Sequence, residues 1–257
     1  MPKIERIEKI KQLLAHQNRI DVNQLSQLLN VSKVTIRNDL KMLETEGVLK
    51  RTHGGAIANT VSLPRTISSL DSSTALSDPD SPINRIAQRA SQYINEKEWI
   101  FLGSGSTCYA IAKAAAHKNV QIVTNNLFIG TYLAPYPNIN VIMCGGKVHT
   151  ERIPFLSGDL ALNNIASMCF SKAFIGVSGA DFKYGYSVSN DVECNIFKTL
   201  QECSQEIVIA TDSSKFDHAA FMSLGRLDIA DVIISDTGMP DAYKDYYESI
   251  NTTLLLT

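Results

Sequence analysis

The first 46 residues contain three stretches in which apolar side chains recur at the three- to four-residue spacing of an amphipathic helix. The first stretch covers residues 3–17 and the second covers 21–30. In the second, Asp21 and Gln24 stand three positions apart, the spacing of a capping box that starts a helix. The third runs from Ser32 to about Glu46. The pattern therefore predicts a small three-helix unit at the amino end.

The connections around the third predicted helix are short. Only Asn30 and Val31 separate the second helix from Ser32, which is a favourable N-cap residue. Gly47 ends the third helix, and the segment 48–57, "VLKRTHGGAI", then predicts two short strands joined by a tight turn. Two helices with a tight turn, followed by a strand pair, are typical of a winged helix-turn-helix.

From residue 83 onward, short apolar runs alternate with helical patterns such as those at 83–96 and 108–118. This alternation predicts an α/β domain with a mostly parallel sheet covered by helices on both faces. The predicted strands lie at 99–102, 120–124, 140–144, 172–177, 206–211, 231–235 and 252–256.

Between these regions the chain is rich in Ser, Thr, Asp and Pro and lacks periodicity, as expected of a linker. We therefore expect a winged helix-turn-helix domain at 1–57, a linker at 58–82 and an α/β domain at 83–257.

The charge is unevenly distributed along the chain. The net charge of -2 combines about +4 in residues 1–57 with about -6 in the remainder. A basic amino-terminal region followed by an acidic remainder suggests a module that binds a polyanion, joined to a domain with another function.

The rest of the composition narrows the function classes. No apolar run is long enough to span a bilayer, and the amino end has no apolar signal region, so we expect a cytoplasmic protein with no membrane partner. The five cysteines form no CxxC pair and the histidines are scattered. We expect buried free thiols and no metal. No cofactor is expected.

The third predicted helix carries a stripe of basic residues, Lys33, Arg37 and Lys41, opposite its apolar face. Ser32 begins this helix, and Thr35 and Asn38 flank the stripe with short polar side chains that suit base edges or phosphates. An ordinary solvated helix face gives the same stripe, but the tight turn before it and the basic strand pair after it favour DNA. Since a recognition helix enters the major groove with its amino-terminal half, these side chains are expected near the bases. In the strand pair, Lys50, Arg51 and His53 are expected at phosphates or in the minor groove.

The segment "SKVTIRNDLKMLETEGVLKRTHGGAI" resembles the signature of the DeoR family of bacterial transcription regulators. Asn38 departs from it, because the family has a second Arg there; this points to an altered contact and operator preference. The matching residues are Ser32, Thr35, Ile36, Arg37, Asp39, Leu40, Leu43, Gly47, Leu49, Arg51, His53, Gly54, Gly55 and Ala56.

A glycine-rich turn, "GSGST", follows the predicted strand at 99–102 and opens a helix. Glycines let backbone approach an anion, and a helix N-terminus offers N–H groups and a favourable dipole. Such turns are also common without any ligand. The segment lacks the Lys of a P-loop and the third Gly of a dinucleotide fingerprint, which argues against a nucleotide. The candidate residues are Gly103, Ser104, Gly105, Ser106 and Thr107.

Further polar residues follow other predicted strands, where open α/β sheets bind ligands. Asp212 and Lys215 supply an acceptor and a cation suited to a phosphorylated polyol, although Lys215 also fits an ordinary exposed lysine. Glu193 fits either a hydroxyl-binding acid or a first-turn helix acid. The remaining candidates are Thr124, Asn125, Asn126 and Gly145.

These segments match the effector domain of the same family, so the resemblance covers nearly the whole chain except 58–82. It implies a fold like those of ribose-5-phosphate isomerase and CoA transferases, and a phosphorylated sugar as effector. It further implies phosphate in the 105–107 loop and contacts from Asn125, Asn126 and Lys215. Gly103 replaces the family's Asp, which suggests a different sugar, and the linker lacks the usual Glu- and Arg-containing run, which suggests different domain coupling.

We therefore expect a transcription regulator, in this family most often a repressor, that binds double-stranded operator DNA under control of a phosphorylated sugar. Specific binding calls for a homo-oligomer, a dimer or tetramer, that reads repeated half-sites. The alternative is an enzyme: a sugar-phosphate isomerase with an added DNA-binding head, using Asp212, Glu193 and Lys215. A CoA-transferase-like enzyme needs a catalytic Glu that the sequence does not single out.

Overall fold

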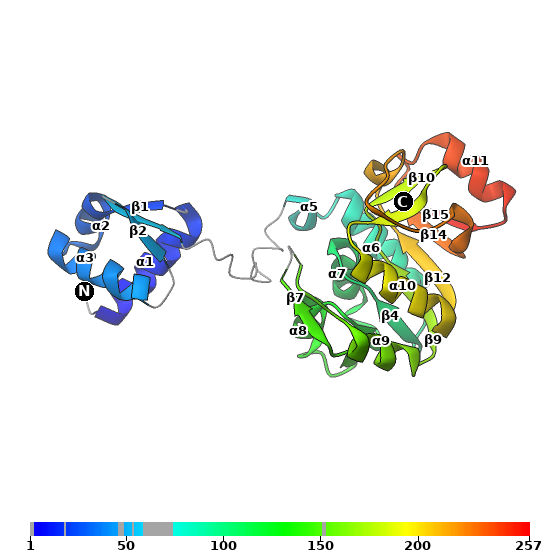
Figure 1. Ribbon diagram of the computed structural model, residues 1–257, viewed down its shortest axis with the longest axis horizontal. Helices are drawn as coiled ribbons and strands as arrows, with labels where there is room; N and C mark the ends of the chain where they lie inside the picture. Colours follow the sequence, from blue (N-terminus) through cyan, green and yellow to red (C-terminus); the bar gives the residue numbers. More distant parts are fainter. Residues whose placement is uncertain (1–2, 18, 46–48, 53, 59–73, 151–152) are drawn as a thin grey trace. The chain divides into compact units, whose positions relative to one another are not determined.

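The computed structural model describes residues 3–17, 19–45, 49–52, 54–58, 74–150 and 153–257 (Figure 1). The chain divides into two compact units, Met1–Leu63 and Pro64–Thr257. The division falls inside the predicted linker, most of which lies outside the described residues. The described part of that linker contains a short helix, α5 (Thr74–Ser77).

The first unit has the predicted three helices and strand pair. The helices are α1 (Lys3–Gln17), α2 (Val22–Leu29) and α3 (Lys33–Thr45). The strands β2 (Leu49–Thr52) and β3 (Gly55–Ala58) form an antiparallel pair. A short strand that the sequence pattern did not indicate, β1 (Arg19–Asp21), adds to the other edge of β3.

Local capping explains where the helices of this unit begin. The Asp21 carboxylate accepts the N–H groups of Asn23 and Gln24, at 2.7 and 3.2 Å, and so starts α2. The Ser32 hydroxyl accepts the N–H of Thr35 at 3.2 Å and starts α3. The apolar faces then meet in one core, made by Ile7, Ile10, Leu14, Ile20, Val22, Leu25, Leu29, Ile36, Leu40, Leu43, Leu49 and Ala56.

The second unit is built on a seven-stranded sheet of order β15-β14-β12-β9-β4-β5-β6. Every neighbouring pair in it is parallel, as the alternating pattern predicted. Its strands are β4 (Trp99–Leu102), β5 (Gln121–Thr124), β6 (Asn140–Met143), β9 (Phe170–Ile175), β12 (Ser204–Ala210), β14 (Val232–Ser235) and β15 (Thr253–Leu256).

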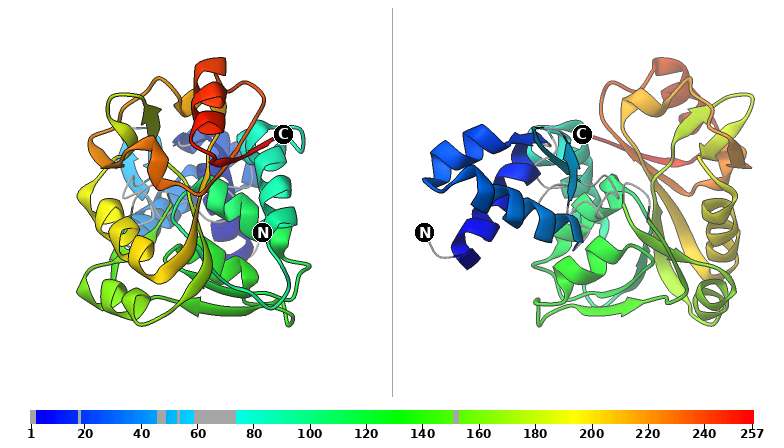
Figure 2. Two further views of the ribbon diagram at one scale, coloured as in Figure 1. Left: turned by 90° about the vertical axis from the view of Figure 1, so that its right-hand side faces the viewer. Right: turned by 60° about the vertical axis from the view of Figure 1, so that its left-hand side comes forward.

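Helices cover both faces of this sheet (Figures 1 and 2). One face packs against α6 (Pro82–Tyr93), α7 (Ser106–Ala115) and α8 (Leu127–Leu133). The other packs against α9 (Asp159–Ala166), α10 (Asp191–Cys203) and α11 (Asp241–Ser249). Because both faces are buried, the strands are continuously apolar rather than alternating.

Smaller elements lie beyond the main sheet. A hairpin joins β7 (Lys147–His149) and β8 (Phe155–Ser157). The elements β10 (Gly179–Asp181), β11 (Gly185–Val188) and β13 (Met222–Gly225) make a three-stranded antiparallel sheet. Two short 3-10 turns, η1 (Ser213–Lys215) and η2 (Leu227–Ile229), complete the unit.

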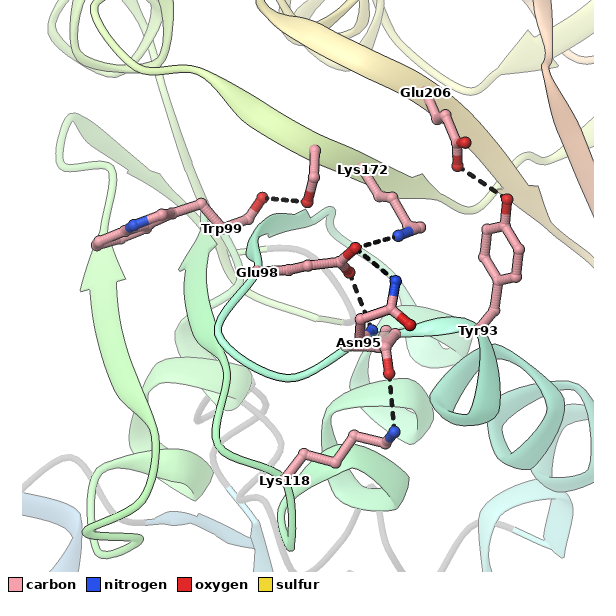
Figure 3. A network of polar contacts seen from close by, with 9 residues as sticks. Tyr93, Asn95, Glu98, Trp99, Lys118, Lys172 and Glu206 are labelled. Atoms are coloured by element: carbon pink, nitrogen blue, oxygen red, sulfur yellow. Dashed lines mark hydrogen bonds and ion pairs between the residues drawn. The ribbon is translucent and has the colours of Figure 1, made fainter.

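A buried ion pair lies near the amino ends of the central strands (Figure 3). Lys172 in β9 donates to the carboxylate of Glu98, which also accepts the backbone and side-chain N–H groups of Asn95 at 3.0 and 2.8 Å. The Lys172 ammonium lies 5.1 Å from the centre of the Tyr93 ring, and the Tyr93 hydroxyl donates to Glu206 at 2.9 Å. This network ties α6 to three parts of the sheet.

Within the described residues, no helix is both long enough and apolar enough to cross a bilayer.

Candidate functional site

The helix α3 presents its predicted polar face to solvent. Lys33, Arg37, Asn38 and Lys41 are exposed, whereas the apolar stripe of the same helix is buried. Thr35 is half-buried, and its hydroxyl pairs with that of Ser32 at 2.9 Å.

A hollow of about 210 Å³ lies between α2, α3 and the β2–β3 strand pair. Arg37 and Arg51 both line it, so the structure brings a cation of the helix together with a cation of the strand pair. The Arg51 N–H donates to the Glu44 carboxylate at 2.8 Å, which ties β2 to α3. Two guanidinium groups at one concave surface suit a phosphate backbone. His53, also predicted to contact DNA, lies outside the described residues.

A second candidate site is a cleft at the carboxyl ends of three adjacent strands, β4, β9 and β12, in the second unit. Its volume is about 360 Å³. The lining residues are Leu76, Ile83, Ser104, Gly105, Ser106, Thr107, Gly176, Val177, Ser178, Val188, Glu193, Thr211, Asp212 and Lys215. Seven of them were candidates from the sequence, drawn from three separate segments: Ser104, Gly105, Ser106, Thr107, Glu193, Asp212 and Lys215.

One wall of the cleft is the amino end of α7. Gly105 is the N-cap residue with φ of 107°, a conformation that side chains disfavour. Apart from adjoining residues of the chain, no described residue has a heavy atom within 4 Å of the point that a Cβ would take there, so this wall is open at the glycine. Among the described residues, no side chain caps the helix, which leaves its first N–H groups available to an anion.

The cleft is also lined by Glu193, in the first turn of α10. Asn190 caps this helix by accepting the Glu193 N–H at 2.9 Å, and its amide donates to the Glu193 carboxylate at 3.3 Å. The Ser104 hydroxyl donates to the same carboxylate at 3.1 Å. This contact joins the glycine-rich turn to α10 and holds a hydrogen-bond acceptor at the edge of the cleft.

Lys215 reaches the cleft from the turn that follows β12. Asp212 caps that turn by accepting the Ser214 N–H at 3.0 Å. Asp236 anchors the turn from outside by accepting the N–H groups of Ser213 and Gly238, at 2.6 and 3.1 Å. Burial by itself would raise the pKa of Asp236, but these hydrogen bonds outweigh it and lower the pKa below its ordinary value. The ionised anchor thus fixes the direction from which Lys215 enters.

Most polar side-chain groups of the segment 124–126 form hydrogen bonds within the fold. The Thr124 hydroxyl donates to the Leu102 carbonyl at 2.6 Å, and Asn126 caps α8 by accepting the N–H groups of Phe128 and Ile129. The Asn126 amide also donates to the Gly105 carbonyl at 3.4 Å. Both side chains are buried and support the glycine-rich turn from behind.

Asn125 is placed differently from its two neighbours. With Gly103 it lines a small space of about 20 Å³ that shares Ser104, Gly176 and Glu193 with the cleft. Its buried side-chain oxygen has no hydrogen-bond partner among the described residues. The space behind Gly103 is tight, because an added Cβ would lie 3.3 Å from both Ile175 and the Phe174 carbonyl.

The residues that line the cleft differ in part from those expected from the sequence. Gly145 is absent from the residues lining the cleft and instead lies beside Leu160 and Asn164 of α9. Conversely, Ser178 and Thr211 line the cleft although the sequence reasoning did not single them out. Each follows a buried strand, the same signal that identified Lys215.

The prediction of buried free thiols is confirmed for Cys108, Cys144 and Cys194, but it is wrong for Cys169, which is exposed, and Cys203 is only half-buried. Burial raises the pKa of Cys108 to about 12 and that of Cys144 to about 11. Within the part of the chain that the structure describes, no group of three or more His, Cys, Asp or Glu residues is placed to hold a metal ion.

Two family models match the chain, one in each unit. The DeoR-like helix-turn-helix domain matches residues 6–62, and the DeoR C terminal sensor domain matches residues 84–237. Among solved structures, ribose 5 phosphate isomerase A from Neisseria gonorrhoeae aligns with 52% of this chain and 52% of its own, at 22% identity and a TM-score of 0.38.

Two regulators match the chain nearly end to end. A protein of Escherichia coli O157:H7, provisionally named as the aga operon transcriptional repressor, is 32% identical over 92% of this chain and 87% of its own. The glycerol-3-phosphate regulon repressor of Escherichia coli K12 is 26% identical over 93% of both chains. Since both domain matches and the first relative extend over most of the sequence, the chain belongs to the DeoR family of transcriptional regulators.

Proposed function

We propose that this regulator represses genes for the use of a carbohydrate. In this proposal, a phosphorylated sugar bound in the cleft of the second unit controls the affinity of the protein for operator DNA. The names of its relatives support this reading: one is a repressor of the aga operon and another of the glycerol-3-phosphate regulon. A third relative, the L-fucose operon activator of Haemophilus influenzae, is 29% identical, so the direction of control is itself part of the proposal.

The observation that carries the sugar-phosphate assignment is the pairing of two kinds of group in one cleft. The uncapped amino end of α7 offers N–H groups, and Lys215 supplies a cation; both favour a phosphate. The Glu193 and Asp212 carboxylates line the same cleft, accept hydrogen bonds and therefore suit hydroxyl groups. A ligand that carries both a phosphate and hydroxyl groups satisfies both kinds of group.

Operator recognition is proposed for α3 and the β2–β3 strand pair. Lys33, Arg37 and Asn38 are exposed on the first half of α3, the part of a recognition helix that enters the major groove. Arg51 lines the same hollow as Arg37 and is assigned to phosphate contacts. Since one such unit reads few base pairs, the proposal includes a homo-oligomer, a dimer or tetramer, acting on double-stranded DNA with repeated half-sites.

Control by the sugar phosphate requires a ligand whose affinity differs between the DNA-bound and free forms. A coupling of about 1–3 kcal/mol is typical of such regulators and corresponds to roughly a 5- to 150-fold change in affinity. Binding that is equally tight in both forms would shift nothing.

The proposal assigns no catalysis to the cleft. A sugar-phosphate isomerase would have to use Glu193, Asp212 and Lys215, all of which line the cleft. The Glu193 carboxylate accepts hydrogen bonds from Ser104 and Asn190, an arrangement that supports a binding role. Incubation with ribose 5-phosphate, followed by chromatography of the products, separates the two: turnover above the uncatalysed rate would favour the enzyme.

The proposal as a whole is tested on the full-length protein in two linked measurements. A panel of sugar phosphates and the matching unphosphorylated sugars is first screened for thermal stabilisation, since a ligand of the folded state raises its stability by mass action. Each stabilising compound is then titrated into a complex with promoter DNA followed by fluorescence anisotropy. We expect at least one phosphorylated sugar, and not its unphosphorylated form, to act in both. Stabilisation without any change in DNA affinity would contradict the regulatory part.

A further inference from the structure

Two of the free thiols lie side by side at the start of neighbouring parallel strands. Cys169 directly precedes β9, and Cys203 is the last residue of α10 and directly precedes β12. The register of the two strands pairs Phe170 with Ser204. Cys169 therefore directly precedes Phe170, and Cys203 directly precedes Ser204, its partner on the adjacent strand.

This register sets the spacing of the two backbones. Neighbouring strands are about 4.8 Å apart, and the Cα atoms of a disulfide are usually about 4.4 to 6.8 Å apart. The Cα atoms of two residues that directly precede paired strands are thus close enough for a disulfide between their side chains.

The two thiols differ in their access to solvent. Cys169 is exposed and Cys203 is half-buried, with its S–H donating to the Thr199 carbonyl at 3.1 Å. Burial raises the pKa of Cys203, and the neighbouring Cys169 thiol raises it further. The other three cysteines, Cys108, Cys144 and Cys194, are buried in the cores of the unit.

We propose that Cys169 and Cys203 form a reversible modification site, which a peroxide converts to an intramolecular disulfide and a dithiol reduces again. In this pair Cys169 is the attacking thiol, because it is accessible, and Cys203 is the resolving thiol. The site stands on the strand register and the exposure of the two residues, and is independent of the ligand proposed for the cleft.

The chemistry balances without any bound group. The Cys169 thiolate attacks one oxygen of hydrogen peroxide, breaks the O–O bond and becomes a sulfenic acid, releasing hydroxide that takes up a proton as water. The Cys203 sulfur then attacks the sulfenic sulfur, expels the hydroxyl group as a second water and gives up its own proton. Two thiols and one peroxide thus give one disulfide and two waters.

A disulfide at this point would act on α10. That helix begins beside the cleft, where Glu193 lies in its first turn, and it ends at Cys203. Oxidation would join its last residue covalently to the start of β9, and so restrict the movement of an element that also lines the cleft. Oxidation of the two thiols would therefore affect the cleft through α10.

Tryptic mapping of the full-length protein tests the site directly. Cleavage at lysine and arginine places Cys169 alone in the peptide 153–172 and Cys203 alone in the peptide 199–215. After treatment with a small excess of hydrogen peroxide and alkylation of the remaining thiols, we expect these two peptides joined, with a mass lower by two hydrogen atoms. The number of titratable thiols in denaturant falls from five to three, and dithiothreitol restores all five.

Single variants complete the test. In Cys203→Ser, whose hydroxyl keeps a donor for the Thr199 carbonyl, we expect no joined peptide and a sulfenic acid at Cys169 that dimedone traps. In Cys169→Ser, we expect all four remaining thiols to persist under the same treatment. The inference is overturned if the oxidised protein keeps five thiols, if Cys169 is found only as sulfinic acid, or if its disulfide joins two protein molecules.

Discussion

The guanidinium group of Arg6 in α1 bonds at two points to the carboxylate of Asp39 in α3, with Nε–Oδ2 at 2.6 Å and Nη2–Oδ1 at 3.2 Å. Only 10% of the Arg6 side chain and 4% of the Asp39 side chain are exposed. The hydrogen bond from Arg6 to Asp39 raises the pKa of Arg6 against the opposing effect of burial. One face of α3 is thus fixed to α1 while the other presents Arg37 to solvent.

Replacing Asp39 by Ala should destabilise the first unit. The change leaves the buried Arg6 guanidinium without its carboxylate partner, and breaking a buried ion pair in this way costs about 3 kcal/mol. Hydrogen exchange of peptides from α1 and α3 in the full-length protein measures the loss. The matched control is Glu44→Ala, which removes an exposed ion-pair partner of Arg51 and an exposed acceptor of its backbone N–H, and should cost only about 1 kcal/mol. If peptides of α1 and α3 exchange hydrogen equally slowly in Asp39→Ala and in Glu44→Ala, the Arg6–Asp39 pair does not stabilise the first unit.

Replacing Arg37 by Ala should weaken operator binding. The side chain is exposed at the hollow that α3 shares with the strand pair, and a lost base contact costs about 1–3 kcal/mol, or roughly 5- to 150-fold in affinity. Fluorescence anisotropy with promoter DNA at fixed salt measures the change. Lys9→Ala serves as control, because it removes one exposed positive charge from α1. Should Lys9→Ala lose as much affinity as Arg37→Ala, net charge rather than a contact would explain the result.

Replacing Asn38 by Arg should restore the basic residue usual at this position of the signature. Asn38 is exposed beside Arg37, so a guanidinium there has access to the same DNA. If the new side chain contacts a phosphate, the slope of log affinity against log salt becomes steeper by about 0.9. Binding is measured over a series of salt concentrations with operator and with unrelated DNA. A steeper slope on both indicates a phosphate contact, and an unchanged slope on both means that Asn38 does not face DNA.

The recognition of the first unit from sequence worked because its signals are local. The Ser32 N-cap, the apolar stripe of α3 and the turn between β2 and β3 each specify conformation within a few residues. The strand β1 has no such signal, since it is only three residues long and forms solely by pairing with β3. Its existence depends on tertiary contact, which a pattern along the chain does not record.

The cleft was only partly predictable for a related reason. A polar residue after a strand signals the carboxyl edge of the sheet but not what its side chain bonds there. Lys215 lines the cleft, whereas Thr124 and Asn126 bond to backbone groups of the fold. The antiparallel sheet of β10, β11 and β13 was also missed, because its strands are only three or four residues long and contain glycine and serine, and because β13 comes from a segment far from the other two.

Replacing Lys215 by Ala should impair the response to the sugar phosphate and spare DNA binding. The ammonium is assigned to the phosphate, and a hydrogen bond to a charged group contributes about 1.5–3 kcal/mol, so ligand affinity should fall roughly tenfold or more. Thermal stabilisation by the compound found in the screen measures this. Lys198→Ala, an exposed lysine of α10 that does not line the cleft, should respond like the unaltered protein. A normal response of Lys215→Ala would remove this residue from the site.

Replacing Glu98 by Gln should weaken the acid sensitivity of the second unit. Burial by itself raises the pKa of Glu98, but hydrogen bonds from Lys172 and Asn95 outweigh it, and the pKa lies below the ordinary value of 4.5. A carboxylate whose pKa is lower when folded stabilises the protein fully above that ordinary value. This stabilisation is lost as the pH falls through the folded pKa.

The measurement is urea unfolding from about pH 6 to about pH 3, followed by the fluorescence of Trp99, the single tryptophan, which adjoins Glu98. At the upper end, Glu98→Gln should be less stable than the unaltered protein, because Lys172 loses its charged partner. Its free energy of unfolding should then fall less steeply below pH 4.5, since it lacks this proton uptake. Glu96→Gln, an exposed change in the same loop, should keep the original steepness. If Glu98→Gln follows the unaltered curve at every pH, the Glu98–Lys172 pair does not stabilise the fold.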